Sequence, residues 1–303
     1  MEGREAATAP HAAVRERRSA IRTLATALEM IKFSHTLFAL PFALLAAVLA
    51  ARGWPSLSTT LKILLAMAGA RSAAMAHNRL ADRMIDAANP RTAQRALPAG
   101  ALSVRFTVLF LIVSVLVFLA AAASLNRLTL LLSPIALAVL LTYAYTKRFT
   151  WLSHLVLGLC LGIAPVGAWI AVRGRIDLVP VLLGFAVLFW TAGFDILYAL
   201  QDESHDRSVG LQSFPARWGA RRALLVSALL HGLMLLLLVS VWRLSGGGGL
   251  FALGILATAG ALVYQHAIVK PGDLSRIDAA FFTANGFVSV ALAVFGIADV
   301  LTR

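Results

Sequence analysis

Cysteine and acidic residues are scarce in this chain. Its 303 residues include one cysteine and 14 acidic side chains, against 27 lysines and arginines. Because Cys160 stands alone inside an apolar run, a disulfide framework and a thiolate metal site are both excluded. Charged residues make up only 14% of the sequence, whereas 60% of it is hydrophobic. A soluble core cannot bury that much apolar surface, so the composition predicts an integral membrane protein.

The net charge of +13 bears on the partners of the protein. In a soluble domain such a charge would indicate nucleic acid. Here the basic residues stand in loops between apolar stretches, where they lie against anionic lipid on the cytoplasmic side of a membrane. We therefore expect the lipid bilayer as a partner, and no nucleic acid.

Long apolar windows recur along the chain. A helix that crosses a bilayer needs roughly 20 mostly apolar residues. Nine such windows occur, near residues 34–51, 60–80, 103–123, 127–146, 151–172, 178–199, 220–242, 249–268 and 278–300. They predict an all-α bundle of nine transmembrane helices in a single domain over residues 21–303. Residues 1–20 are expected to form a flexible cytoplasmic tail rather than a signal peptide, followed by an amphipathic segment, residues 21–33, at the interface.

Lysine and arginine are distributed unevenly between alternate loops. They are about threefold more frequent on the side of the N-terminus, and this excess marks the cytoplasmic face. The sequence therefore predicts an inner-membrane protein with a cytoplasmic N-terminus and an external C-terminus. Two long polar loops, around residues 87–102 and 201–219, fall on the cytoplasmic face.

Six of the 14 acidic residues gather in two short stretches. The first reads NRLADRMIDAANPRT, residues 78–92, and the second reads DILYALQDESHDRSVGLQS, residues 195–213. On a helix that turns about 100° per residue, one face holds Asn78, Asp82 and Asp86. If the sixth helix continues far enough, one of its faces holds Asp195, Tyr198, Asp202 and Asp206. Both faces end at the same boundary of the membrane.

Several carboxylates in one cavity repel one another and lose hydration, so they require cations. Carboxylate and amide oxygens without cysteine favour a hard ion, Mg²⁺ ahead of Ca²⁺ or Zn²⁺. Mg²⁺ is commonly shared between one or two carboxylates and the phosphates of a substrate. The basic residues that suit such phosphates are Arg91, Arg95, Lys147 and Arg148. The pattern predicts that the acids hold Mg²⁺ for a diphosphate at the membrane surface.

Two other interpretations of these acids stay open at this point. Acids near a helix end often form a solvated face or pair with nearby arginines. A divalent-cation transporter would also place acids in a membrane protein, but near the bilayer midplane in broken helices. Their position at cytoplasmic helix ends, beside basic loops, favours the diphosphate.

The same residues resemble the motifs of the UbiA-type intramembrane aromatic prenyltransferases. Residues 78–92 fit the family's N-x-x-x-D-x-x-x-D motif, and residues 89–100, NPRTAQRALPAG, are similar to the loop that follows it. Residues 195–206 resemble the second motif, D-x-x-Y-A-x-x-D-x-x-x-D, although Glu203, Ser204 and His205 replace the run of acids that members often have there. Residues 143–150, YAYTKRFT, fit a Y-x-x-x-K element. The resemblance spans nearly the whole chain and implies a central cavity that opens to the cytoplasmic side.

The resemblance also implies a role for the polar residues. One Mg²⁺ would be held by Asn78, Asp82 and Asp86, and a second by Asp202 and Asp206. The diphosphate would be contacted by Lys147 and Arg91. The carboxylate of the acceptor would pair with Arg148 or Arg95. The motifs leave the role of Glu203 and His205 undefined.

By the same resemblance, Asp195 would orient or deprotonate the acceptor phenol, and Tyr198 and Tyr143 would line the site. The two tyrosines are equally consistent with ordinary aromatic residues of the membrane interface. His35 and His154, each near a helix end, are expected to make ordinary polar contacts rather than to take part in catalysis.

The implied substrates are a polyprenyl diphosphate and an aromatic acid, either 4-hydroxybenzoate or 1,4-dihydroxy-6-naphthoate. Residues 31–47, IKFSHTLFALPFALLAA, look more like the menaquinone-pathway branch of the family than the ubiquinone branch. Prenyl transfer to haem or to a lipid is the nearest alternative. The sequence predicts neither the length of the prenyl chain nor the oligomeric state.

Overall fold

The computed structural model describes residue 26 and residues 36–303. Within these residues the protein is helical, and no β-strand occurs. Apart from residue 26, the predicted tail, the amphipathic segment of residues 21–33 and His35 lie outside the described part. They stay predictions.

The helices follow the apolar windows closely, and each window overlaps one long helix. In chain order the elements are α2 (Thr36–Ala51), α3 (Leu57–Ala88), α4 (Val104–Leu125), α5 (Arg127–Thr146), α6 (Ser153–Arg173), α7 (Leu178–Tyr198), the 3₁₀ turn η2 (Ala199–Asp202), α8 (Glu203–Ser208), α9 (Phe214–Trp218), α10 (Ala220–Leu244), α11 (Gly249–Ile268), the π turn η3 (Ala279–Ala284) and α12 (Asn285–Leu301).

Polar side chains cap the starts of several helices. The side chains of Ser56, Ser103 and Asn126 each accept a hydrogen bond from the backbone N–H three residues later, at 2.9–3.1 Å. Such caps satisfy backbone donors that have no partner within the helix. They fix where α3, α4 and α5 begin.

Seven helical segments of the described residues are long and apolar enough to cross a membrane. They begin at Val104, Arg127, Ser153, Leu178, Ala220, Gly249 and Ala279. The described part of α2 contributes a shorter apolar helix, Phe38–Ala51. α3 has 32 residues, but charged side chains such as Lys62, Arg71 and Arg79 interrupt its apolar surface. The seven segments show an integral membrane helical bundle, whereas the total of nine spans stays a prediction.

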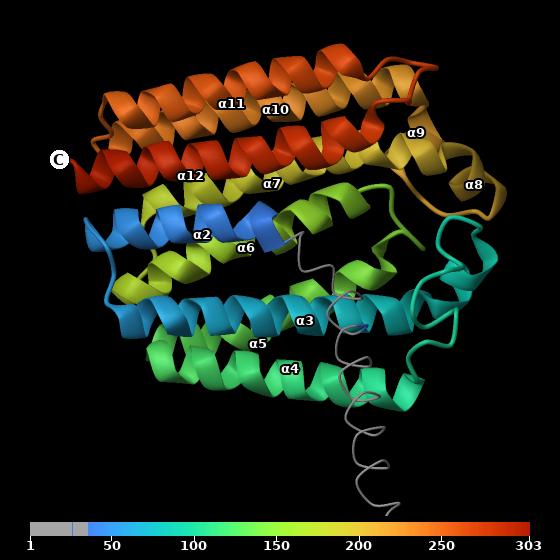
Figure 1. Ribbon diagram of the computed structural model, residues 1–303, viewed down its shortest axis with the longest axis horizontal. Helices are drawn as coiled ribbons and strands as arrows, with labels where there is room; N and C mark the ends of the chain where they lie inside the picture. Colours follow the sequence, from blue (N-terminus) through green and yellow to red (C-terminus); the bar gives the residue numbers. More distant parts are fainter. Residues whose placement is uncertain (1–25, 27–35) are drawn as a thin grey trace, which may run out of the picture.

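The long helices lie side by side (Figure 1). α7 packs between α6 and α10, and α2 packs against α6 and α12. The core between them contains Trp190, Phe42 and Phe251, all fully buried. One end of the bundle carries α8, α9 and the connection from α3 to α4, whereas the C-terminus lies at the opposite end (Figure 1). Both acidic stretches reach the first of these ends.

α6 and α7 approach each other closely because glycines line their contact. A side chain at Gly158 would collide with the backbone carbonyl of Leu188, and one at Gly162 would collide with the carbonyl of Gly184. Small residues allow two membrane helices to pack backbone against backbone. This close packing brings the first turn of α6 beside the last turns of α7.

The sixth predicted helix does not continue unbroken through the second acidic stretch. α7 ends at Tyr198, and the chain passes through η2 before α8 begins at Glu203. A 3₁₀ turn advances about 120° per residue, so the four-residue spacing no longer keeps side chains on one helical face. The four residues Asp195, Tyr198, Asp202 and Asp206 therefore do not share the face of one continuous α-helix, and the 3₁₀ turn between α7 and α8 changes their relative directions.

Candidate active site

A large cavity, with a volume of about 710 Å³, extends into the bundle from the residues around η2 and α8. All twelve site residues predicted from the sequence line it: Asn78, Asp82, Asp86, Arg91, Arg95, Tyr143, Lys147, Arg148, Asp195, Tyr198, Asp202 and Asp206. His205 lines it as well. Glu203 is not among the lining residues and instead pairs with Arg207 at 3.0 Å.

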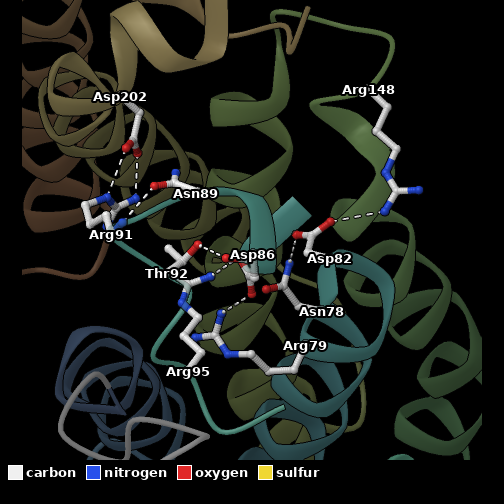
Figure 2. A network of polar contacts seen from close by, with 10 residues as sticks. All are labelled: Asn78, Arg79, Asp82, Asp86, Asn89, Arg91, Thr92, Arg95, Arg148 and Asp202. Carbon is white, nitrogen blue, oxygen red and sulfur yellow. Dashed lines mark hydrogen bonds and ion pairs between the residues drawn. The ribbon is translucent and has the colours of Figure 1, made fainter. Parts of the chain in front are cut away.

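Asp82 lies between an amide and a guanidinium (Figure 2). Asn78 precedes Asp82 by four residues on the same face of α3. Its side-chain amide donates a hydrogen bond to Oδ2 of Asp82 at 3.3 Å. Arg148, just beyond the end of α5, donates to Oδ1 at 3.1 Å and to the backbone carbonyl of Ala81 at 2.8 Å. The helical spacing predicted for the first motif is thus present, and the segment after α5 supplies the counter-ion of Asp82.

Asp86 is buried and lies between two arginines (Figure 2). Arg95 donates to its Oδ1 at 2.6 Å, and Arg79 lies 3.8 Å from its Oδ2. The hydroxyl of Thr92 donates to the backbone carbonyl of Asp86 at 2.9 Å, which folds the following loop back over the end of α3. Oδ2 of Asp86 is buried without a hydrogen-bond partner among the described residues.

Asp202 in η2 is held by the same loop. Both of its oxygens accept from Arg91, from Nε at 2.9 Å and from Nη2 at 2.6 Å (Figure 2). The Asn89 side chain, at the end of α3, accepts from the backbone N–H of Arg91 at 2.9 Å. A bidentate arginine–carboxylate pair fixes both distance and orientation. The loop therefore links the two acidic motifs directly.

Asp206, in α8, is 4% exposed, and its Oδ2 has no hydrogen-bond partner in the described part of the chain. Its backbone carbonyl accepts from the N–H of Leu211 at 2.9 Å, and the next N–H, that of Gln212, donates to the carbonyl of Lys147 at 2.7 Å. These bonds hold the segment after α8 against the end of α5. They bring Lys147 and Asp206 to the same rim of the cavity.

Asp195 lies deeper, in α7, and its partner is His154 at the start of α6. Oδ2 of Asp195 and Nδ1 of His154 are 2.6 Å apart. The backbone N–H of Phe214 donates to Nε2 of the same ring at 3.2 Å. Because Nε2 accepts a hydrogen bond, the ring proton sits on Nδ1 and is donated to Asp195. The imidazole therefore orients one oxygen of Asp195, whose side chain lines the cavity.

The inner wall of the cavity is apolar and aromatic. Phe281 packs on Tyr198 with ring centroids 4.1 Å apart and on Phe194 at 5.3 Å. Phe281 belongs to the π turn η3, whose altered bonding leaves carbonyls that the Asn285 amide satisfies, including that of Phe281 at 2.9 Å. π turns are frequent at functional sites because they displace a side chain from regular helical register. Here the displaced ring closes the wall behind Tyr198.

A comparison with known proteins is consistent with this cavity, which has polar groups at its rim and an apolar wall behind them. The chain matches the UbiA prenyltransferase family over residues 39–287. This chain belongs to the UbiA prenyltransferase family. The resemblance noted from the motifs is thereby confirmed, and the protein is a prenyltransferase. Membership in a family of transferases excludes the cation-transporter alternative.

Relatives of this UbiA-family prenyltransferase cover most of its length. The 4-hydroxybenzoate octaprenyltransferase of Aliivibrio fischeri (strain MJ11) is 31% identical over 248 residues, 81% of this chain and 86% of the relative. The 4-hydroxybenzoate octaprenyltransferase of Yersinia enterocolitica serotype O:8 is 32% identical over 244 residues, 80% of this chain and 84% of the relative.

Solved structures of the family share the fold. A UbiA homologue from Aeropyrum pernix K1 superposes with a TM-score of 0.80 at 36% identity, covering 88% of this chain and 98% of the other. A UbiA homologue from Archaeoglobus fulgidus bound to DMAPP and Mg²⁺ superposes with a TM-score of 0.70 at 22% identity, covering 91% and 99%. At the lower identity the likeness concerns the fold alone.

The donor set of this UbiA-family site fits Mg²⁺. In the described part of the chain no three His, Cys, Asp or Glu side chains converge closely enough to enclose a metal ion by themselves. Each acidic motif instead offers two carboxylates, one of which has a buried oxygen without a hydrogen-bond partner, in Asp86 and in Asp206. An ion that keeps waters and takes further ligands from substrate phosphates suits such incomplete sites.

The sequence analysis assigned no site role to the cavity residues Arg71, Arg79 and Phe281. It assigned none to His154, which contacts Asp195 without lining the cavity. Arg79 had a usable signal, because it precedes Asp86 by seven residues and therefore shares its helical face. His154 had none, since 41 residues separate it from Asp195. His154 makes a polar contact, as expected from the sequence. Its partner is Asp195, however, which is a predicted catalytic residue.

Proposed function

We propose that this protein transfers a polyprenyl group from a polyprenyl diphosphate to a ring carbon of an aromatic acid, with Mg²⁺, and releases diphosphate. One observation carries the proposal: a single cavity joins a rim of carboxylates and arginines to an apolar aromatic wall. The rim matches a metal-bound diphosphate, and the wall matches a prenyl chain and an aromatic ring.

The comparisons support this reading. The curated relatives are named 4-hydroxybenzoate octaprenyltransferase. The homologue from Archaeoglobus fulgidus binds DMAPP, an allylic diphosphate, together with Mg²⁺. Two acidic motifs at the rim of one cavity give this chain the groups that such ligands require.

We assign the first Mg²⁺ to Asn78, Asp82 and Asp86 and the second to Asp202 and Asp206. Mg²⁺, when bound, would neutralise negative charge on the leaving diphosphate. Lys147 and Arg91, both at the rim, would bind the diphosphate oxygens. The carboxylate of the acceptor would pair with Arg148 or Arg95.

The reaction exchanges one carbon–oxygen bond for one carbon–carbon bond. The allylic C–O bond breaks and its electron pair leaves with the diphosphate, while the ring carbon beside the phenol oxygen bonds to the allylic carbon. The ring then loses its proton. Asp195, oriented by His154, is placed to orient the phenol and to take a proton from it when it is ionised. The dry aromatic wall keeps water from the allylic cation.

We expect 4-hydroxybenzoate to be the acceptor, because curated relatives that cover about four fifths of this chain are named for it. The likeness of residues 31–47 to the menaquinone-pathway branch makes 1,4-dihydroxy-6-naphthoate the second candidate. Both offer a phenol and a carboxylate, so the same rim and wall suit both.

We also propose that the cavity opens to the cytoplasm of an inner-membrane protein with its N-terminus inside and its C-terminus outside. The distribution of lysine and arginine between the loops supports this orientation. The positions of the acidic motifs and the C-terminus at opposite ends of the bundle agree with it (Figure 1).

Membranes that contain the protein, incubated with Mg²⁺, a polyprenyl diphosphate and each acid in a separate reaction, test the assignment of the acceptor. The account predicts a lipid-soluble prenylated product with 4-hydroxybenzoate. Product with the naphthoate alone would instead assign the second candidate. Diphosphate binding without product from either acid would contradict the aromatic-acid acceptor.

A further inference from the structure

We propose that Arg91, Arg95 and Arg148 are exchangeable counter-ions, which hold the metal-binding carboxylates until a diphosphate group draws them away. A divalent metal and a diphosphate would then bind as a coupled pair, each weakly without the other. This inference rests on the proposed function, because it concerns the same carboxylates and the same substrate class.

The contacts pair each arginine with one carboxylate of the acidic motifs (Figure 2). Arg148 bonds Asp82 at 3.1 Å, Arg95 bonds Asp86 at 2.6 Å, and Arg91 bonds both oxygens of Asp202. At least one oxygen of Asp82, of Asp86 and of Asp202 is thus already engaged by a cation. A metal ion that approaches Asp202 or Asp82 must compete with a guanidinium for these oxygens.

The charges of the cavity are close to balance. Five carboxylates and six lysine or arginine side chains line it. A metal ion alone would add positive charge to a site that already holds its cations, and would leave a displaced guanidinium without a partner. A diphosphate alone would draw arginines away and leave carboxylates uncompensated. Breaking a partly buried ion pair in this way is costly, whereas exchanging partners is not.

The exposure of the arginines shows which of them have room to move. The side chains of Arg91 and Arg148 are 40% and 39% exposed, and that of Arg95 is 29% exposed. Arg79, the second cation beside Asp86, is 7% exposed. We assign Arg79 as the fixed counter-ion of Asp86 and the other three as the mobile ones.

Two of the three mobile arginines also lie over an aromatic ring at the rim. The guanidinium of Arg91 lies 6.0 Å from the centre of the Tyr198 ring, and that of Arg148 lies 5.0 Å from the centre of the Tyr145 ring. Aromatic faces attract cations. These arginines can therefore turn toward a diphosphate without leaving the rim.

Coupling between two ligands is reciprocal, so it can be measured from the metal side. Equilibrium dialysis of detergent-solubilised protein with Mn²⁺, with and without inorganic diphosphate, gives the protein-bound Mn²⁺ in each case. Free complexes of Mn²⁺ with diphosphate equalise across the dialysis membrane and do not contribute. For the wild type we expect diphosphate to raise the affinity for Mn²⁺ by about tenfold or more.

Arg91→Gln and Arg148→Gln test the exchange in two separate ion pairs. Each variant should bind Mn²⁺ alone more tightly than the wild type does, and each should gain less from diphosphate. Arg83→Gln is the matched control, because Arg83 is exposed beside Asp82 on α3 and makes no ion pair with a described carboxylate. It removes the same charge and should behave as the wild type does.

The outcomes separate this inference from the proposed function. Tight binding of Mn²⁺ and diphosphate without coupling would overturn the exchange and leave the proposed site intact. Equal affinity for Mn²⁺ alone in the wild type and in both arginine variants would overturn the exchange as well. Failure of the wild type to retain either ligand, even in combination, would overturn the proposed function together with the exchange.

Discussion

At the scale of single residues, the contact between Asp195 and His154 decides how the acceptor would be activated. The N–H of Phe214 fixes the tautomer of the imidazole, and the imidazole orients one oxygen of the carboxylate. His154 does not line the cavity, so it acts on Asp195 rather than on a substrate. We therefore describe it as a positioning residue.

Two amide variants separate the two hydrogen bonds of His154. In His154→Asn the amide nitrogen replaces Nδ1 and keeps the donor to Asp195, whereas in His154→Gln the amide oxygen replaces Nε2 and keeps the acceptor for Phe214. We expect His154→Gln to lower kcat by about tenfold or more, with little change in the KM for the prenyl diphosphate. His154→Asn should keep much more of the wild-type kcat than His154→Gln does. Steady-state kinetics of both variants check this.

A purely structural role predicts a different pattern. Equal losses in both variants, together with equal losses of thermal stability, would show that the ring is needed only for packing. His154 is almost fully buried, so the melting temperature of each variant is the necessary control.

The residues of the two acidic motifs could be predicted from the sequence, but only some of their hydrogen-bond partners could be. Regular spacing on one helix places Asn78, Asp82 and Asp86 together, and the structure has the amide of Asn78 bonded to Asp82. The contact between His154 and Asp195 arises only because α6 packs on α7, and no local pattern encodes that packing. Roles at the site stay predictions, since geometry alone does not assign them.

At the scale of elements, the apolar runs predicted the long helices well, and the departures from them lie at the site. Neither the 3₁₀ turn η2 nor the π turn η3 has a hydrophobic pattern of its own. Both are held by tertiary contacts, such as the bond from Arg91 to Asp202 and the bond from Gln265 to the backbone carbonyl of Ala280. The hydrophobic pattern of the sequence therefore did not predict the 3₁₀ turn η2.

The contact of α6 with α7 predicts that Gly158 tolerates no side chain. Gly158→Ala would push a methyl group into the carbonyl of Leu188, so the helices must separate. We expect a loss of about 1–3 kcal/mol of stability, as for an overpacked core, with a loss of activity because His154 shifts relative to Asp195. Thermal unfolding in detergent and the transfer assay measure the two effects.

Gly232→Ala is the matched control for this prediction. Gly232 is an exposed helical glycine in α10 with nothing close to an added methyl group. Its replacement should leave the melting temperature unchanged or slightly raised. A Gly158→Ala protein as stable and as active as this control would contradict the role given to the helix contact.

At the scale of the whole molecule, the orientation in the membrane follows from the loops. The acidic motifs and the connection from α3 to α4 share one end of the bundle, and the C-terminus lies at the other (Figure 1). The number of spans that separate them, and the side on which each end lies, stay predictions from hydropathy and charge.

Cysteine labelling tests the orientation, and the single native cysteine makes the background simple. In a Cys160→Ala background, we expect a membrane-impermeant maleimide to label Thr302→Cys in intact cells and to label Ala99→Cys only after the membrane is opened. Both positions are exposed, one at the C-terminus and one in the loop after α3. Labelling of Ala99→Cys in intact cells would contradict a cytoplasmic site.

The central claim is that the two acidic motifs carry out metal-dependent prenyl transfer. The most direct measurement follows prenylated product and released diphosphate together, with purified protein stripped by EDTA and titrated with Mg²⁺. For the wild type we predict equal amounts of both, dependent on Mg²⁺, and for Asp82→Asn a loss of about a hundredfold or more. Asp278→Asn, which makes the same change at an exposed position that does not line the cavity, should retain activity. Product formation that survives EDTA, or that survives Asp82→Asn unchanged, would contradict the account.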